Sequence, residues 1–264
     1  MNLRRLSSIV TLLGFSTLIA LVPGLLAMGQ ESSQPTPCVL VELFTSEGCS
    51  SCPPADKVLS NLQNQQPIPG VHIITLGEHV SYWNYLGWQD PFSSDLFTER
   101  QHSYAGVFRA SSVYTPQMIV DGHSEFVGND YSKAISTIRE AAKTSKAAIV
   151  VDVRSASNDN LIIKGGIKWL SVNEAHAAAL VAVLVEDNLH SSVSRGENSG
   201  RVLNHSSVAR ELIDGNNSLQ ASGAFEIAAA IKPSWKRQNL RVVVFAQNPA
   251  TGDILGAAES KLSN

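Results

Sequence analysis

Apolar runs of strand and helix length follow one another in the first half of the chain. CVLVELF, residues 38–44, is almost entirely apolar, which is typical of a strand buried on both faces. Pro53 and Pro54 suit the first turn of a helix, and ADKVLSNLQNQ then carries apolar residues at helical spacing. VHIITL, starting at Val71, predicts the next strand. The pattern therefore predicts a strand, a helix and a second strand parallel to the first.

The following runs predict two more helices and a hairpin. A helical pattern starts at Ser94 and continues through DLFTERQHSYAGVF. TPQMIVDG and SEFVG predict two strands joined by a turn at Asp121 and Gly122, which is a strong hairpin signal. DYSKAISTIREAAKT then predicts a helix with Asp130 as its N-cap. The order predicted for residues 38–146 is βαβαββα.

The pattern changes at Ala147, where extended runs replace helical ones. Five such runs are separated by turn residues: AAIVVDV, NLIIKGGIKWL, AALVAVLVED, GAFEIAAAI and LRVVVFAQ. Several short strands without helices between them are typical of an antiparallel sandwich. We therefore expect an α/β fold, with one domain at residues 38–146 and a mostly antiparallel, β-sandwich-like domain at residues 147–264.

The first 29 residues resemble a secretory signal peptide. Arg4 and Arg5 precede a long apolar stretch, and the triplet AMG ends it at Gly29. An uncleaved membrane anchor is the alternative, because the stretch approaches the roughly 20 apolar residues that span a bilayer. Proline and glycine late in the stretch favour a cleaved peptide. We expect a secreted or periplasmic protein with a flexible lead-in at residues 30–37.

Composition excludes one class of partner and supports a folded core. Cleavage at Gly29 would remove two of the 20 basic residues and none of the 23 acidic ones. An acidic balance argues against a nucleic-acid partner, which requires a basic face. With 44% hydrophobic and 16% charged residues, the chain has the composition of a globular protein.

The three cysteines do not form a disulfide framework, but two of them form a Cys-x-x-Cys pair. Cys49 and Cys52 fall at the start of the first predicted helix, whereas Cys38 lies at the far end of the preceding strand and is expected to be a buried small side chain. Unpaired N–H groups and the helix dipole would stabilise a thiolate on an exposed Cys49. Cys49 would then attack a substrate, and Cys52 would resolve the mixed disulfide.

Two other interpretations of the pair stay open. One is a local structural disulfide, although closing so short a loop stabilises a fold less than closing a long one. The other is a zinc or copper site, which needs about four ligands and has only His79 and His102 as further donors to consider. We expect no metal and no cofactor.

A second signal lies at VYTPQMIVDG, far along the chain. Pro116 stands just before an apolar strand, where a cis Thr115–Pro116 bond would bring its loop beside the cysteines. The alternative is an ordinary trans proline that starts a strand. The combination of both signals is more specific than either one alone.

This combination resembles the thioredoxin superfamily over residues 38–144. The resemblance implies that Cys49 attacks, that Cys52 resolves, that the bond before Pro116 is cis, and that Thr115 pairs its backbone with an extended substrate. Two departures concern the residues around the first cysteine, which are Gly48 before it and two serines after it. Neither Glu42 nor Asp56 can be assigned as a buried acid of the thioredoxin type.

A closer resemblance covers nearly the whole mature chain. ELFTSEGCSSCPPAD, HVSYWNYLGWQDPF, FTERQ, VYTPQMIVDG and RGENSGRVLNH are similar to a bacterial family of secreted proteins called domain of unknown function 1223. That resemblance implies a thioredoxin-like domain followed by a β-rich part. It implies no established reaction.

Two polar or aromatic segments are further candidates. Aromatic residues crowd the segment after the second strand, where they would line a substrate groove beside Cys49 or pack as a lid over the sheet: Tyr82, Trp83, Tyr85, Trp88 and Phe92. His79 is the histidine expected closest to the cysteines, as a substrate contact or a structural residue. SRGENSGRVLNH carries polar side chains for an interdomain latch, a ligand site or a solvated loop: Arg195, Glu197, Asn198, Arg201 and His205.

Three hypotheses for function follow from these signals. The first is an exported thiol–disulfide oxidoreductase that acts on protein or small-molecule thiols and disulfides. Its expected site residues are Cys49 and Cys52 for catalysis, with Thr115, Pro116, Trp83, Trp88 and His79 for substrate binding. The second is a copper- or peptide-binding module without turnover. The third is a structural protein whose C-terminal domain docks to an envelope protein.

Overall fold

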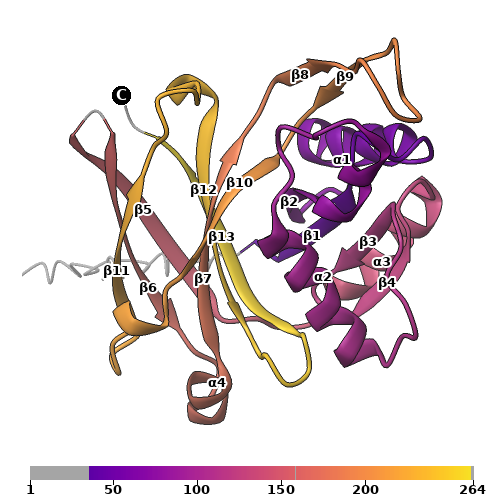
Figure 1. Cartoon of the computed structure of the whole chain (residues 1–264). Coiled ribbons are helices and arrows are strands. Elements are labelled where there is room, and N and C mark those ends of the chain that lie inside the picture. The colour runs from indigo at the N-terminus through magenta and orange to yellow at the C-terminus, as the bar shows by residue number, and fades with distance from the viewer. Residues whose placement is uncertain (1–35, 158, 263–264) are drawn as a thin grey trace, which may run out of the picture. The chain divides into compact units, whose positions relative to one another are not determined.

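The computed structural model describes residues 36–157 and 159–262 (Figure 1). The predicted signal peptide at residues 1–29 lies outside this part of the chain, as do residues 30–35 of the predicted lead-in. Export and cleavage therefore stay predictions. No helix within the described ranges is long and apolar enough to cross a membrane.

The first half of the chain forms the predicted elements in the predicted order, with one short 3-10 helix, η1, in addition. The elements are β1 (Cys38–Thr45), α1 (Pro53–Gln65), β2 (His72–His79), η1 (Ser81–Leu86), α2 (Asp95–Phe108), β3 (Gln117–Val120), β4 (Ser124–Val127) and α3 (Tyr131–Ala141). β1 and β2 pair in parallel over their full length, and β3 and β4 form an antiparallel hairpin. Ser94 caps α2 and Asp130 caps α3 through side-chain oxygens, as the sequence predicts for Asp130.

The second half is mostly strand, and all five predicted runs form strands. Its elements are β5 (Ala148–Ser157), β6 (Asn160–Lys168), α4 (Val172–Ala177), β7 (Ala179–Glu186), β8 (Leu189–Ser192), β9 (Val202–His205), β10 (Val208–Asp214), η2 (Asn216–Ser218), β11 (Ala224–Ala230), η3 (Arg237–Asn239), β12 (Leu240–Gln247) and β13 (Ile254–Lys261).

One mixed sheet contains strands from both halves of the chain. Its order is β13-β12-β7-β10-β2-β1-β3-β4. The junction is a parallel pairing of β10 with β2 at Val208 and Gly77, where the Gly77 N–H donates to the carbonyl oxygen of Ser207 at 2.7 Å. The fold is therefore mixed α/β with a large mixed sheet and few helices. The domain boundary at 146/147 stays a prediction, because this sheet runs across it.

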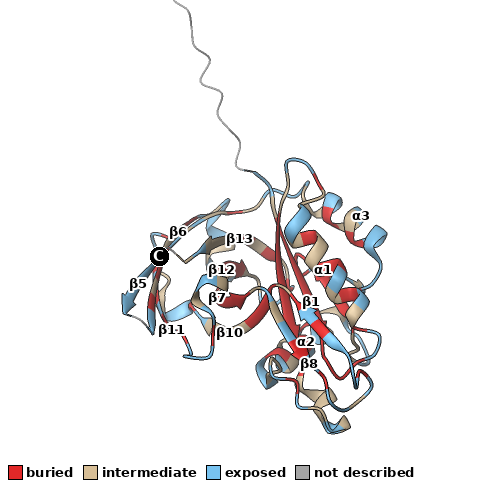
Figure 2. Cartoon of the chain, turned by 90° about the horizontal axis from the view of Figure 1, so that it is seen from above, coloured by how far each residue is buried: buried red, intermediate tan, exposed pale blue. Residues whose placement is uncertain are grey.

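Helices cover both faces of the strands from the first half. α1 and α3 pack on one face, where Val41 and Leu43 share a core with Leu59 and Ile138. α2 packs on the other face, where Tyr104 joins Phe44 and Ile119 in a separate cluster. Because both faces are covered, β1 is buried over all but its first residue, and buried residues concentrate along the central strands (Figure 2).

A three-stranded sheet, β11-β6-β5, packs on the large sheet within the second half. Val153, Ile163 and Phe225 from the small sheet share a core with Val242 and Val244 from the large one. β8 and β9 form a separate antiparallel hairpin. Figure 1 shows this hairpin β8–β9 reaching over to α1, which β9 contacts.

Candidate active site

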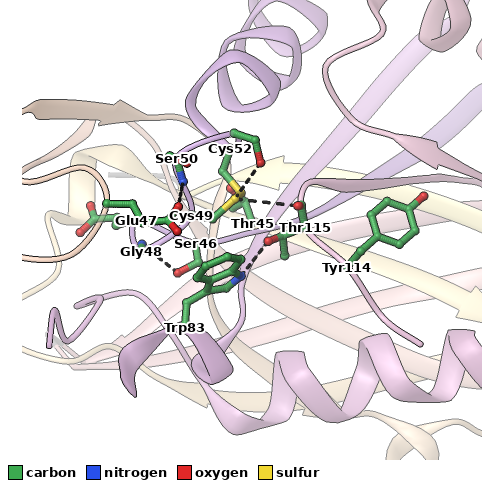
Figure 3. The surroundings of a disulfide bond; sticks show 12 residues. Thr45, Ser46, Glu47, Gly48, Cys49, Ser50, Cys52, Trp83, Tyr114 and Thr115 are labelled. Atoms are coloured by element: carbon green, nitrogen blue, oxygen red, sulfur yellow. Dashed lines mark hydrogen bonds between the residues drawn. A yellow bond between two sulfur atoms is a disulfide. The ribbon is translucent and has the colours of Figure 1, made fainter. Parts of the chain in front are cut away.

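Cys49 and Cys52 form a disulfide in the cysteine loop, residues 46–52, between β1 and α1 (Figure 3). The S–S distance is 2.19 Å and the two Cα atoms are 5.4 Å apart. Cys52 is the N-cap residue of α1, and its N–H donates to the carbonyl oxygen of Cys49 at 3.2 Å. The predicted pairing at the start of a helix is thus present in the oxidised form.

The expected exposure of Cys49 is wrong. Cys49 is 1% exposed and Cys52 is fully buried, whereas Ser50 and Ser51 are exposed. Trp83 packs against the loop so closely that a Cβ on Gly48 would meet the Trp83 Cβ at 3.0 Å. Side chains from other segments cover Sγ of Cys49, and the sequence around Cys49 does not predict this burial.

The loop that contains Thr115 and Pro116 lies against the disulfide. The Thr115–Pro116 bond is cis, as predicted, and the carbonyl oxygen of Thr115 is 3.9 Å from Sγ of Cys49. The indole N–H of Trp83 donates to Oγ1 of Thr115 at 2.8 Å. Two residues predicted to contact substrate, Trp83 and Thr115, therefore lie beside Cys49 (Figure 3).

The helix N-terminus offers fewer donors to the sulfur than expected. Pro53 and Pro54 are the first two residues of α1 and carry no N–H group. The hydroxyl oxygen of Ser51 lies 3.3 Å from Sγ of Cys49 and is placed to donate to it. In the reduced protein a Cys49 thiolate would depend on this hydroxyl and on the helix dipole.

Trp88 and His79, two other predicted substrate contacts, are held next to the cysteine loop by hydrogen bonds to Glu47 and Asp90. Trp88 donates its indole N–H to Oε2 of Glu47 at 2.8 Å. His79 is hydrogen-bonded to Asp90 at 2.7 Å, and the same Asp90 oxygen accepts the N–H of Glu47. Sequence reasoning missed Glu47 and Asp90, although Glu47 lies two residues before the first cysteine.

Charge explains the pairing of His79 with Asp90. Burial is the largest single influence and acts to lower the pKa of His79, but the carboxylates of Asp90, Asp56 and Glu47 together raise that pKa. Burial likewise acts first to raise the pKa of Asp90, but His79 and the N–H groups of Glu47 and Phe92 together lower it. Both shifts favour a charged pair at neutral pH beneath the loop.

Hairpin β8–β9 from the second half of the chain fastens the cysteine loop. The buried side chain of Asn198 donates to the carbonyl oxygens of Glu47 and Cys49, both at 2.9 Å. Glu197 accepts the N–H of Ser50 at 2.9 Å, and His205 is hydrogen-bonded to Glu47 at 2.9 Å. These contacts match the latch interpretation of the SRGENSGRVLNH segment.

Glu197 places a carboxylate next to the candidate nucleophile. Its hydrogen bonds to Ser50 lower its pKa, so the group is anionic at neutral pH. We expect Glu197→Gln to increase the thiolate fraction of Cys49 in the reduced protein, and its alkylation rate at neutral pH about twofold, because an exposed like charge acts weakly through water. Alkylation by iodoacetamide in a Cys38→Ser background measures this. Glu99→Gln, an exposed change on α2, is the control, and equal rates in both variants would contradict the expectation.

The third cysteine is separate from this site. Cys38 is free and half-buried at the start of β1. Burial raises the pKa of its thiol to about 12. Cys38 is therefore a thiol rather than a thiolate at neutral pH.

The sequence pattern of the family described as "Protein of unknown function (DUF1223)" matches residues 40–247. The chain belongs to this family. The match includes the cysteine loop, the Thr115–Pro116 loop and hairpin β8–β9, so all the contacts described above lie inside the DUF1223 region.

Two solved structures resemble this DUF1223 protein. A crystal structure of a protein from Agrobacterium tumefaciens is 25% identical, with a TM-score of 0.62, and the similarity covers 86% of this chain and 94% of that one. HBP35 of Porphyromonas gingivalis is 15% identical, with a TM-score of 0.63, covering 86% of this chain and 76% of that one. Both similarities concern the fold. No curated protein sequence matches the chain.

A metal site is one of the alternative interpretations of the cysteine pair of this DUF1223 protein. Within residues 36–157 and 159–262, no group of three or more His, Cys, Asp or Glu side chains is placed to hold a metal ion. His102, considered as a donor from the sequence, is an exposed residue of α2.

Proposed function

We propose that this DUF1223 protein is an exported thiol–disulfide oxidoreductase that uses Cys49 and Cys52. The observation that carries the proposal is the contact of 3.9 Å between Sγ of Cys49 and the carbonyl oxygen of Thr115. The loop that contains Thr115, 66 residues further along the chain, thus lies against the disulfide. An extended substrate that reaches Cys49 would have to align with this loop.

The finer fold assignment is part of this proposal. We infer a thioredoxin-like domain at residues 38–146 and a sandwich-like domain at residues 147–264. The element order β1-α1-β2-α2-β3-β4-α3, with helices on both faces of the strands, supports the first. The shared core between the small sheet and the large sheet supports the second.

The proposed reaction is an exchange in two steps. A substrate thiolate attacks Sγ of Cys49, the Cys49–Cys52 bond breaks, and its electron pair goes to Sγ of Cys52. A second substrate thiolate then attacks the substrate sulfur of the mixed disulfide, which releases a substrate disulfide and the Cys49 thiolate. Two electrons have passed from the substrate dithiol to the cysteine pair. The reverse sequence reduces a substrate disulfide.

A substrate can reach Sγ of Cys49 only if one of the side chains that bury this sulfur moves. Trp83 is half-buried and spans from Gly48 in the cysteine loop to Thr115 in the proline loop. Its indole therefore lies between the cysteine loop and the proline loop, at the place where a substrate chain would contact both loops. We infer that Trp83 rotates away when substrate binds and breaks its hydrogen bond with Thr115.

Trp83→Phe tests this role because it removes the indole donor and keeps an aromatic ring. A neutral hydrogen bond contributes about 1 kcal/mol, so the variant should be reduced by glutathione about fivefold faster than the parent protein. Stopped-flow measurement of disulfide reduction gives this rate. Trp169→Phe, at a half-buried residue that packs against the core of the second half, is the matched control. Identical rates in both variants would show that Trp83 does not limit access.

A second candidate function is a copper- or peptide-binding module of the same fold, in which the cysteine pair does not turn over. The burial of both sulfurs favours this candidate because it limits their reaction with thiols. Stoichiometric copper or peptide binding without thiol exchange would support this candidate instead.

The redox potential of the pair distinguishes these functions. The protein is equilibrated with mixtures of reduced and oxidised glutathione, and the Cys49–Cys52 pair is quantified by alkylation and mass spectrometry. An exchanging pair should have a potential between about −270 mV, typical of a reductant, and about −120 mV, typical of an oxidant. A potential below about −300 mV is typical of a structural disulfide and would contradict the proposal.

Location and partners are part of the proposal as well. The charged start, apolar stretch and AMG triplet of residues 1–29 support export to the periplasm or beyond. The expected partners are protein or small-molecule thiols and disulfides, with no nucleic acid. Residues 147–264 are the part proposed to contact an envelope protein. Comparing the signal sequence with the mature N-terminus by Edman or mass analysis tests the export step.

A further inference from the structure

The FTERQ segment, residues 97–101, lies on α2 and contains none of the residues proposed to react or to bind substrate. Two of its side chains hold η1, the short helix between β2 and α2. Oγ1 of Thr98 accepts a hydrogen bond from the N–H of Ser81 at 3.0 Å. Oε1 of Gln101 accepts one from the hydroxyl of Tyr82 at 3.1 Å. α2 therefore holds η1 at its first two residues.

The same Gln101 side chain also holds the loop that contains Thr115, the proline loop. Nε2 of Gln101 donates to the carbonyl oxygen of Tyr114 at 2.7 Å and to Oε1 of Gln117 at 2.9 Å. Gln117 is the first residue of β3. One amide group on α2 thus contacts η1, the proline loop and the start of the strand that follows this loop.

The amide group of Gln101 is fully buried, and its oxygen and nitrogen both have partners. If the amide were turned over, its oxygen would face the oxygens of Tyr114 and Gln117, so the hydrogen bonds fix its orientation. Gln117 is oriented in turn by donating to Oε2 of Glu125 at 3.1 Å. Because a buried polar group without a partner is costly, this amide restrains the positions of the groups that it contacts.

The residues that follow these contacts are the two that meet beside the disulfide. Trp83 follows Tyr82, and Thr115 follows Tyr114. The indole N–H of Trp83 donates to Oγ1 of Thr115 at 2.8 Å (Figure 3). Gln101 therefore holds the residue before each partner of the hydrogen bond that closes the site.

The hydrogen bond between Tyr82 and Gln101 is present throughout the neutral pH range. Burial raises the pKa of Tyr82 to about 12, and the hydrogen bonds with Gln101 and Thr115 offset only part of that rise. The Tyr82 hydroxyl therefore keeps its proton at neutral pH and donates it to Gln101.

We propose that Gln101 is a positioning residue that holds Trp83 closed over Cys49 and fixes the backbone of Thr115 for pairing with an extended substrate. It acts through the residues before Trp83 and Thr115. The inference rests on the proposed function and deepens it, because the same amide would limit the reaction of small thiols and favour extended peptides that pair with the proline loop.

The test compares two thiols that reduce the Cys49–Cys52 disulfide of the full-length mature protein: mercaptoethanol and a short extended peptide with one central cysteine. Each rate constant is divided by the thiolate concentration. In Gln101→Met, which keeps the length of the side chain, the mercaptoethanol constant should rise about fivefold, because Trp83 loses a restraint worth one hydrogen bond.

The ratio of the peptide constant to the mercaptoethanol constant should fall about fivefold in the same variant. The proline loop loses its hydrogen bond with Gln101, so the peptide loses a preformed partner while mercaptoethanol, which is too small to pair with the loop, does not. A variant that only loosens the fold would raise both constants together and leave their ratio unchanged.

Tyr104→Phe is the matched control because it removes a buried hydroxyl from the same helix. This hydroxyl donates to Glu42 on β1, and the phenylalanine ring keeps the packing of the tyrosine. The ratio of the two constants should stay within about twofold of the parent value. An equal fall of the ratio in Tyr104→Phe and Gln101→Met would overturn the specific role of Gln101.

Tyr82→Phe covers the case in which Gln101→Met does not fold, because it removes only the hydroxyl of a half-buried side chain. Both constants should rise about fivefold, with an unchanged ratio, since the proline loop keeps its contact. Parent-like constants in folded Tyr82→Phe, or a parent-like ratio in folded Gln101→Met, overturn the role of Gln101, while reduction of the parent protein by the peptide still supports the proposed function. No reduction of the parent protein by either thiol would overturn both.

Discussion

Replacing Cys49 with serine should lower the rate of thiol–disulfide exchange by about 10³-fold or more. A hydroxyl is not ionised at neutral pH and cannot form a mixed disulfide, so the first step is lost rather than slowed. The assay is reduction or oxidation of a model peptide disulfide by the purified mature protein. Loss of a disulfide that closes so short a loop should also cost about 2 kcal/mol of unfolding free energy, so folding is checked by circular dichroism at the assay temperature.

Cys38→Ser is the matched control because it makes the same chemical change on β1, outside the cysteine loop. Cys38 is free, and its thiol has a pKa of about 12 because of burial. Its replacement should leave exchange within about twofold of the parent rate, as most changes away from the reacting groups do. Equal activity in Cys49→Ser and the parent protein would exclude Cys49 as the nucleophile.

Asn198→Ala should give the largest loss of stability outside the apolar core, about 2–3 kcal/mol. The variant removes the donor to the Glu47 carbonyl oxygen, leaves a small cavity and frees Arg201, whose guanidinium donates to Asn198 at 3.1 Å. A buried carbonyl without a partner costs about 1–3 kcal/mol. Urea unfolding measures the change as a lower midpoint with an unchanged slope.

The same variant should make the disulfide easier to reduce, because the cysteine loop loses its anchor on hairpin β8–β9. Asn204→Ala, an exposed change in that hairpin, is the control and should stay within about 0.5 kcal/mol of the parent protein. If both variants had the same midpoint and the same reduction rate, the hairpin would not fasten the loop.

Local apolar pattern predicts most elements of the first half, from β1 to α3, and the five strongest strands of the second. It does not predict β10 or β13. VARELID mixes polar and apolar residues because β10 is only partly covered, and ILGAAESK is rich in small residues. The pairing of β10 with β2 joins residues more than 130 positions apart, and nothing in either run specifies that partner.

For the site, sequence reasoning brings together Cys49, Cys52, Thr115 and Trp83 correctly. Each of these residues belongs to a motif that can be recognised in the sequence without knowledge of the other segments. The burial of Cys49 was not predictable because exposure depends on segments that arrive from elsewhere, namely η1 and hairpin β8–β9. For the same reason Glu47 had no visible role: its partner His205 lies 158 positions further along the chain.

The most direct test of the account is to trap the mixed disulfide. Reduced Cys52→Ala protein, which lacks the resolving thiol, is incubated with a model peptide disulfide, and the product is digested and analysed by mass spectrometry. The account predicts a stable mixed disulfide on Cys49 and none on Cys38. A folded variant that forms no adduct on Cys49, or forms one only on Cys38, would contradict it.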